Sequence, residues 1–150
     1  AMGGAIARNL VERGWSVVGC DPDPVRAGEA RDAAVVVEEG AAAVAAKAEV
    51  VLTSLPSAAA FHSVASEISA TAPAGRLVVE MSTLALADKI AGEETLRSAG
   101  HTMLDCPLSG TGAQAQTRDL VVYASGEEER IASLEALFMD FARAVHNVGA

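Results

Sequence analysis

Aromatic residues are scarce in this sequence: Phe, Trp and Tyr together make up 3% of its 150 residues. Hydrophobic residues nevertheless reach 51%, so a folded core must be filled mainly by Ala, Val and Leu. That composition is typical of helices that cover a parallel sheet, and it argues against disorder. A chain of this length can form one domain with a sizeable core.

Positive charge and cysteine are also sparse. The formal net charge is -9, and Lys and Arg form no basic stripe, which disfavours a DNA or RNA partner. Cys20 and Cys106 lie far apart, so we expect free thiols in a reducing compartment, without a disulfide framework. No spacing of metal ligands is visible. No apolar run approaches membrane-spanning length and no signal peptide is visible, so we expect a cytoplasmic protein with no membrane partner.

Short apolar runs alternate with longer helical patterns along the chain, and this order predicts an α/β fold. Ser57 is the expected cap of one helix, and Ser125 to Glu128 has the spacing of a capping box before another. Helices are predicted over residues 2–13, 24–31, 41–48, 57–68, 87–99 and from 127 to about 141. Strands are predicted over residues 16–21, 34–37, 49–54, 76–81, 101–105, 119–124 and 144–148.

The predicted order begins with a helix, which is unusual for a doubly wound sheet, because its central strand precedes the first helix. We expect a Rossmann-like, doubly wound and mostly parallel sheet with helices on both faces. Residues 1–150 would form one dinucleotide-binding domain, truncated at its N-terminus, whose first strand lies upstream. Gly14 is well placed to end the first helix, because glycine accepts the left-handed conformation that helix ends require.

The first helix and the next strand suggest a dinucleotide site. Free amides at Met2 and Gly3 would face a pyrophosphate, helped by the helix dipole. Asp21 follows 18 residues after Gly3, where a carboxylate would accept hydrogen bonds from ribose hydroxyls and repel a 2′-phosphate. Asp23 strengthens that preference for NAD over NADP, and Arg26 opposes it. Two simpler interpretations stay open: Gly3 as an ordinary small residue, and Asp21 as a helix cap.

Four segments in the same order resemble the β-hydroxyacid dehydrogenase family, which includes 3-hydroxyisobutyrate dehydrogenase, tartronate semialdehyde reductase and 6-phosphogluconate dehydrogenase. They are similar to the end of its glycine motif, its Leu-Pro loop, its Ser-Thr pair and its Asp-Ala-Pro-Val-Ser-Gly substrate motif. In this sequence they read Ala1-Met2-Gly3-Gly4-Ala5-Ile6-Ala7, Leu55-Pro56, Met81-Ser82-Thr83 and Asp105-Cys106-Pro107-Leu108-Ser109-Gly110.

The resemblance implies a role for each matching residue. Leu55 and Pro56 would form the cofactor wall, and Thr83 would lie against the nicotinamide ribose. Ser109 and Gly110 would hold the substrate carboxylate, because loop amides can form an anion nest without a buried cation. The alternatives are a capped helix start at Ser82-Thr83 and a simple turn at Ser109-Gly110.

The sequence departs from the family pattern at three places. Glu80 replaces the usual Asp, Thr111 replaces a second glycine, and a later glycine of the same loop is replaced near Arg118. We expect Arg118 to be a solvated surface residue rather than an additional anion contact. The same exposure is expected of Lys47 and Lys89. No histidine has a catalytic context: we expect surface or strand-end positions for His62 and His101 and a terminal strand for His146.

No catalytic residue is therefore assigned within the chain. The resemblance implies a general acid/base lysine beyond Ala150, in an all-helical second domain through which the whole protein would form a homo-oligomer. The leading hypothesis is a dehydrogenase, inactive as this fragment alone, that acts on a small 3-hydroxy acid or the matching semialdehyde with NAD. The alternatives are an imine reductase on the same scaffold, a non-catalytic nucleotide-binding module, and a degenerate chain that binds nothing.

Overall fold

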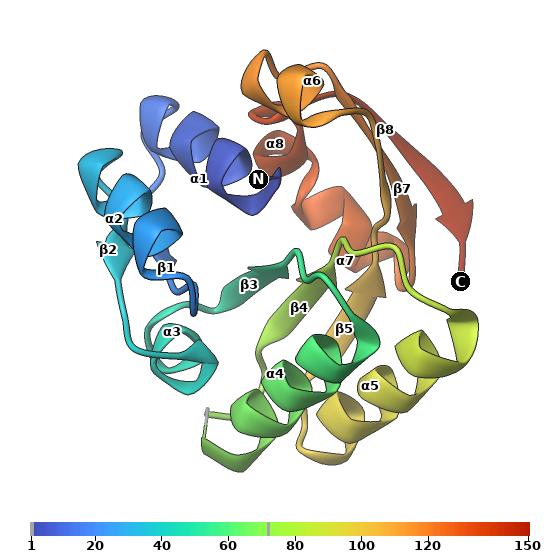
Figure 1. Ribbon diagram of the computed structural model, residues 1–150. Helices are drawn as coiled ribbons and strands as arrows, with labels where there is room; N and C mark the ends of the chain where they lie inside the picture. Colours follow the sequence, from blue (N-terminus) through green and yellow to red (C-terminus); the bar gives the residue numbers. More distant parts are fainter. Residues whose placement is uncertain (1, 72) are drawn as a thin grey trace.

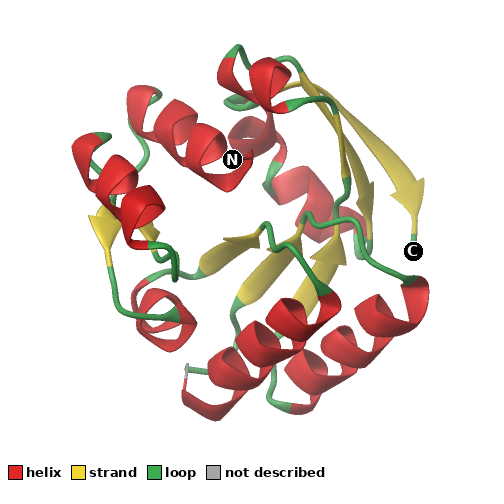
Figure 2. Cartoon of the chain, in the orientation of Figure 1, coloured by secondary structure: helices red, strands yellow, loops and turns green. Residues whose placement is uncertain are grey.

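The computed structural model describes residues 2–71 and 73–150. Strands and helices alternate, and helices cover both faces of the larger sheet (Figures 1 and 2). In chain order the elements are α1 Met2–Glu12, β1 Val18–Gly19, α2 Pro24–Asp32, β2 Val36–Val37, α3 Ala41–Lys47, β3 Val50–Thr53, α4 Ala58–Thr71, β4 Leu77–Glu80, α5 Leu86–Ser98, β5 Thr102–Asp105, β6 Leu108–Ser109, α6 Gly112–Gln116, β7 Leu120–Ser125, α7 Glu128–Ser133, α8 Glu135–Met139 and β8 Ala142–Gly149.

The larger sheet is parallel in its first half and changes direction once. β3, β4 and β5 pair in parallel, whereas β7 runs antiparallel to β5 and to the short strand β6. β8 pairs in parallel with β7 and completes the sheet. The predicted doubly wound, mostly parallel α/β architecture is therefore confirmed.

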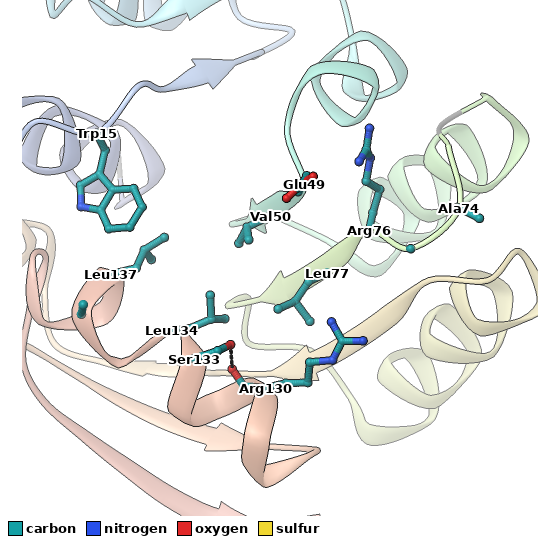
Figure 3. A pocket seen from close by; sticks show the side chains of 12 residues that line it. Trp15, Glu49, Val50, Ala74, Arg76, Leu77, Arg130, Ser133, Leu134 and Leu137 are labelled. Carbon is teal, nitrogen blue, oxygen red and sulfur yellow. Dashed lines mark hydrogen bonds between the residues drawn. The ribbon is translucent and has the colours of Figure 1, made fainter.

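β1 and β2 form a second, separate parallel sheet. Among the described residues, β1 pairs only with β2, and β3 pairs only with β4, so each sheet ends in an open edge (Figure 1). A cavity of about 510 Å³ opens at the amino ends of β3 and β4, and Trp15, Leu134 and Leu137 line its other side (Figure 3). It lies at the opposite edge of the sheet from the loops that follow β3, β4 and β5.

Alternating side chains of β4 divide the core into two layers. Leu77 and Val79 pack on the side of α1, α7 and α8, whereas Val78 packs on the side of α3, α4 and α5. Such alternation follows from the period of two residues in a strand. All four residues of β4 are buried, which is expected for the middle of a sheet covered on both faces.

Most predicted elements are present within two residues of their expected ends. Gly14 follows α1 with a φ of 91°, as expected, and the Ala60 amide donates to Ser57 Oγ at 3.2 Å. The capping box at Ser125–Glu128 was wrong: Ser125 ends β7, and α7 begins without a side-chain cap. The single helix expected behind it is divided at Leu134 into α7 and α8.

The loop expected after Asp105 contains two elements that the sequence analysis missed. β6 pairs with β7, and α6 is capped by Thr111, which exchanges side-chain hydrogen bonds with Gln114. The spacing of Thr111 and Gln114 is that of a capping box, so a sequence signal was present. Asn9 of α1 donates a 2.7 Å hydrogen bond to the Ala115 carbonyl and ties α6 to α1. In the part of the chain described, no helix combines the length and hydrophobicity needed to cross a membrane.

Candidate functional site

Three neighbouring strands end side by side at one edge of the larger sheet. Thr53, Glu80 and Asp105 are register partners across β3, β4 and β5. Because the strands are parallel, the segments that follow them leave the sheet at the same edge. Parallel pairing therefore brings together Leu55-Pro56, Ser82-Thr83 and the segment that begins at Asp105, three of the segments that sequence analysis singled out.

The amino end of α1 approaches this edge. A Cβ atom built on Gly3 would lie 3.6 Å from Cβ of Ser54, which follows β3. That distance is an ordinary contact, so Gly3 is not required for close packing, and its assigned role in the glycine motif gains no steric support. The first turn of α1 contains no acidic side chain that would compete with an anion for its free amides.

Asp21 follows β1 and is half-buried. Its Oδ1 accepts a 2.9 Å hydrogen bond from the Asp23 amide, whereas Asp23 itself caps α2 by accepting one from Val25. The alternative of Asp21 as a helix cap was therefore wrong. Arg26 Nε lies 3.8 Å from the Asp23 carboxylate. The positive charge that could favour a 2′-phosphate near Asp21 is therefore partly offset by Asp23.

Ser82 joins the loops that follow β3 and β4. Its buried Oγ accepts a 2.7 Å hydrogen bond from the Leu55 amide, and its own amide donates to Glu80 Oε1 at 2.6 Å. Thr53 Oγ1 donates to the other oxygen of the fully buried Glu80. The alternative of a helix cap at Ser82-Thr83 was wrong, because α5 begins later, at Leu86, with Ala85 before it. Pro56 and Thr83 are exposed, as a ligand contact requires.

Ser109 and Gly110 are exposed at the end of β6. Ser109 pairs with Val121, so the segment is a strand end rather than a simple turn. Gly110 has a φ of 138°, and a Cβ atom there would lie 2.7 Å from Cδ2 of Leu120. Both the backbone conformation and the packing therefore require glycine at this position.

Lys89 is the clearest correction to the sequence analysis. It was expected on the surface but is 5% exposed. Its Nζ donates hydrogen bonds to the Ser82 carbonyl at 2.6 Å and to Asp105 Oδ1 at 2.7 Å, and lies 3.6 Å from Glu80 Oε1. The available signal was a pair of acids, Glu80 and Asp105, at the ends of two consecutive strands, because buried carboxylates need a cation.

One further expected surface position was wrong, that of Arg118, whereas Lys47 is exposed as expected. Arg118 is half-buried and pairs with Glu12 at 2.9 Å. Its φ of 58° lies in the left-handed region, consistent with the family's use of glycine nearby. His101 directly precedes β5, which agrees with the expected surface or strand-end position, and it is buried.

The remaining histidines and both cysteines are at the expected kinds of position. His62 is partly exposed and contacts Asp88, and His146 lies in β8. Cys20 and Cys106 are free. Burial first, and then the neighbouring Asp105 carboxylate, raise the pKa of the buried Cys106 thiol to about 12. Within residues 2–71 and 73–150, no three His, Cys, Asp or Glu side chains are grouped to bind a metal.

Comparison with known proteins shows the family to which this chain belongs. The family model of the NAD-binding domain of 6-phosphogluconate dehydrogenase matches residues 1–149. The chain belongs to this family. The sequence resemblance and the expectation of an NAD-binding domain are thereby confirmed.

Individual relatives match nearly the whole of this chain. A probable 3-hydroxyisobutyrate dehydrogenase of Mycobacterium bovis is 29% identical over 149 residues, which are 99% of this chain and 51% of that protein. Human mitochondrial 3-hydroxyisobutyrate dehydrogenase is 30% identical over 141 residues, 91% of this chain and 41% of the human protein. The chain thus spans about half the length of the curated relatives it matches.

Solved structures agree with the fold. The 3-hydroxyisobutyrate dehydrogenase of Mycobacterium tuberculosis, solved with L-serine, has a TM-score of 0.95 and 29% identity, covering 99% of this chain and 51% of that one. An imine reductase from a Pseudomonas species has a TM-score of 0.89 at 18% identity, covering 100% of this chain and 52% of its own, and shares the fold alone.

The residues of the NAD-binding domain fit the cofactor of its family. The amides of α1 are free of acidic competition, and the Asp21 carboxylate stands at the end of a strand. The buried Ser82 holds the Leu55 backbone, leaving the exposed Pro56 and Thr83 side chains free to face a ligand. In the segment assigned to the substrate, the φ of 138° at position 110 requires glycine.

Proposed function

We propose that the intact protein is an NAD-dependent dehydrogenase that oxidises a small 3-hydroxy acid or reduces the matching semialdehyde. The observation that carries the proposal is the register of Thr53, Glu80 and Asp105, because it gathers two cofactor-side loops and the substrate loop at one edge of the sheet. Family members named 3-hydroxyisobutyrate and L-threonate dehydrogenase match most of this chain and support the substrate class.

Cofactor binding is assigned to six residues. The amides of Met2 and Gly3 bind the pyrophosphate at the amino end of α1. Asp21 accepts hydrogen bonds from the adenine ribose and repels a 2′-phosphate, so NAD is preferred over NADP. Leu55, Pro56 and Thr83 surround the nicotinamide riboside, and bound NAD supplies a hydride acceptor at its nicotinamide ring.

Substrate binding is assigned to Ser109 and Gly110. The Ser109 hydroxyl and the neighbouring backbone amides donate hydrogen bonds to a carboxylate, as in other loop anion sites. The proton transfer that accompanies hydride transfer belongs to a lysine in a second, all-helical domain beyond Ala150. That domain also carries the homo-oligomer contacts, and the whole protein works in the cytoplasm without nucleic-acid or membrane partners.

The open edges of β1 and β3 support one more parallel strand between the two sheets. A strand there would join them into one continuous sheet and lead into α1, as doubly wound folds require. The apolar side chains of Trp15, Val50, Leu77 and Leu137 around the cavity offer it a surface to pack against (Figure 3). The residues that precede Ala1 in the full-length protein supply this strand.

The test is a fluorescence titration of the full-length protein with NADH and NADPH, followed by assays on a panel of 3-hydroxy acids. We expect tighter binding of NADH. Asp21→Asn keeps an oxygen for the Asp23 amide but removes the charge, so it reduces the preference for NADH about tenfold or more. Asp32→Asn removes an exposed charge at the end of α2 and serves as the matched control.

Each alternative has its own result. Binding of NADH without turnover of any 3-hydroxy acid would make the protein a nucleotide-binding module. Turnover of cyclic imines in place of hydroxy acids would make it an imine reductase. If neither NADH nor NADPH bound, the proposed function would be wrong.

A further inference from the structure

The ammonium group of Lys89 lies between the loop that follows β4 and Asp105. Asp105 is the first residue of the segment that leads to Ser109 and Gly110, here called the substrate loop. Lys89 reaches this point from near the amino end of α5, which lies beside α4 on one face of the sheet (Figure 1). Its Nζ donates two hydrogen bonds, to the Ser82 carbonyl at 2.6 Å and to Asp105 Oδ1 at 2.7 Å, and forms an ion pair with Glu80 Oε1 at 3.6 Å.

The two sides of this junction depend on Lys89 to different extents. Ser82 is also held through its amide by Glu80 and through its hydroxyl by Leu55. For the Asp105 side chain, the described residues offer Lys89 as the sole hydrogen-bond and ion-pair partner. Loss of the ammonium group would therefore leave the cofactor-side loop anchored and would release the Asp105 side chain, whose backbone stays paired with β4 and β7.

Charge gives Lys89 a second effect. Asp105 is four residues before Ser109, and its side chain is 37% exposed, so its negative charge is only partly buried at the start of this segment. A carboxylate substrate at Ser109 and Gly110 would be repelled by an uncompensated Asp105, most strongly where water is excluded. The buried Lys89 ammonium offsets that charge at a distance of 2.7 Å.

We infer that Lys89 is the positioning residue of the substrate loop: it fixes the Asp105 side chain relative to Ser82 and neutralises the carboxylate at the start of the segment that leads to Ser109 and Gly110. This inference rests on the proposed dehydrogenase function for the identity of the substrate. Lys89 acts through Asp105 and does not touch the substrate, so its removal changes substrate affinity more than cofactor affinity.

The test compares variants in the full-length protein. Lys89→Met alone would leave Glu80 buried and uncompensated, and that variant could fail to fold. The comparison is therefore made in a Glu80→Gln background, where glutamine keeps an acceptor for the Ser82 amide without a charge. Glu80→Gln/Lys89→Met is measured against Glu80→Gln, Glu80→Gln/Lys89→Arg tests rescue, and Lys47→Met removes the exposed lysine as a matched control.

Two readouts are needed. Relative to Glu80→Gln, we expect Lys89→Met to raise KM for the 3-hydroxy acid at least tenfold, with kcat and the NADH dissociation constant changed less than threefold. Arginine should recover most of the loss in KM. Amide hydrogen exchange of residues 105–111 should accelerate at least tenfold, whereas exchange of residues 54–56 should change less than threefold.

The outcomes separate this inference from the proposed function. If the wild-type protein turned over no 3-hydroxy acid, the proposed function would fail, and amide exchange would decide the positioning role alone. An unchanged exchange rate in residues 105–111 would overturn that role. So would equal losses in KM and NADH affinity, since they would indicate a general structural effect of the kind any buried ion pair produces.

Discussion

Gly92 of α5 lies against the edge of the aromatic ring of Phe61 of α4: a Cβ atom built at position 92 would lie 2.1 Å from Phe61 Cε2 and 2.2 Å from Cζ. Phe61 is 1% exposed and packs within the layer between the sheet and these two helices. The close approach of α4 and α5 on this face of the sheet (Figure 2) thus depends on the absence of a side chain at Gly92.

Substitution of Gly92 should therefore destabilise the fold. We expect Gly92→Ala to lower the free energy of unfolding by about 1–3 kcal/mol, because the buried ring must move. Gly28→Ala in α2 is the matched control, since a Cβ atom there meets nothing within 4 Å. That change should be neutral or stabilising by up to about 1 kcal/mol, because alanine favours helix. Urea unfolding of both variants measures the difference, and equal effects would contradict the packing argument.

Removal of the Ser82 hydroxyl should loosen the loop after β3. Ser82→Ala leaves the Leu55 amide without its 2.7 Å acceptor. We expect a loss of about 0.5–1.5 kcal/mol in the free energy of unfolding, the net contribution of one hydrogen bond, because the Leu55 amide is only partly buried. Ser66→Ala, at an exposed position of α4, should change it by less than about 0.5 kcal/mol. A stability of Ser82→Ala equal to that of the control would show that the hydrogen bond contributes nothing.

The two thiols should react at very different rates. The pKa of Cys106 is raised to about 12, so at pH 8 only about one thiol in ten thousand is ionised, and the side chain is also fully buried. Cys20 is exposed as a residue and can be reached by a reagent. Its pKa is also raised, first by partial burial of the sulfur and then by the Glu67 and Asp21 carboxylates. A disulfide reagent should titrate one thiol in the native protein and two after unfolding.

Cysteine variants identify the thiol that reacts. Cys20→Ser should abolish the native reaction, and Cys106→Ala should leave its rate unchanged. The rate should rise with pH, because only the thiolate attacks. A native reaction that survived Cys20→Ser would mean that Cys106 is accessible, contrary to its position in the core.

His101 should make the protein less stable in acid. Its Nδ1 accepts a 3.1 Å hydrogen bond from the Arg76 amide, and burial first, then the Arg76 charge, lower its pKa below 6.5. In the unfolded chain, His101 therefore binds a proton as the pH falls to about 6.5, whereas in the folded protein it stays neutral to a lower pH. The stability linked to His101 is complete above that pH and is lost progressively as the pH falls toward the folded-state pKa.

His101→Asn isolates this effect, because the asparagine oxygen can replace Nδ1 as an acceptor without titrating. The difference in free energy of unfolding between wild type and His101→Asn should shrink from about pH 7.5 to about pH 5. His146→Asn, in the exposed part of β8, is the control. A difference that stayed constant with pH would mean that His101 titrates alike in both states.

Much of this protein follows from local sequence pattern. Alternation of apolar strand runs with amphipathic helices determined the α/β class, because each pattern reports which face of an element meets the core. It also implied that Leu55-Pro56, Ser82-Thr83 and the segment that begins at Asp105 follow strands. Parallel strands then bring such segments to one edge whatever the details of packing. The family resemblance was carried by the same segments.

Other features were decided by tertiary structure. The burial of Lys89 depends on Glu80 and Asp105, which meet only because β4 and β5 pair in one register. The half-buried position of Arg118 likewise involves a partner distant in sequence, Glu12. Local periodicity measures the preference of one segment for water or core. A charged side chain enters the core only when long-range pairing supplies its partners, and that energy is absent from any single segment.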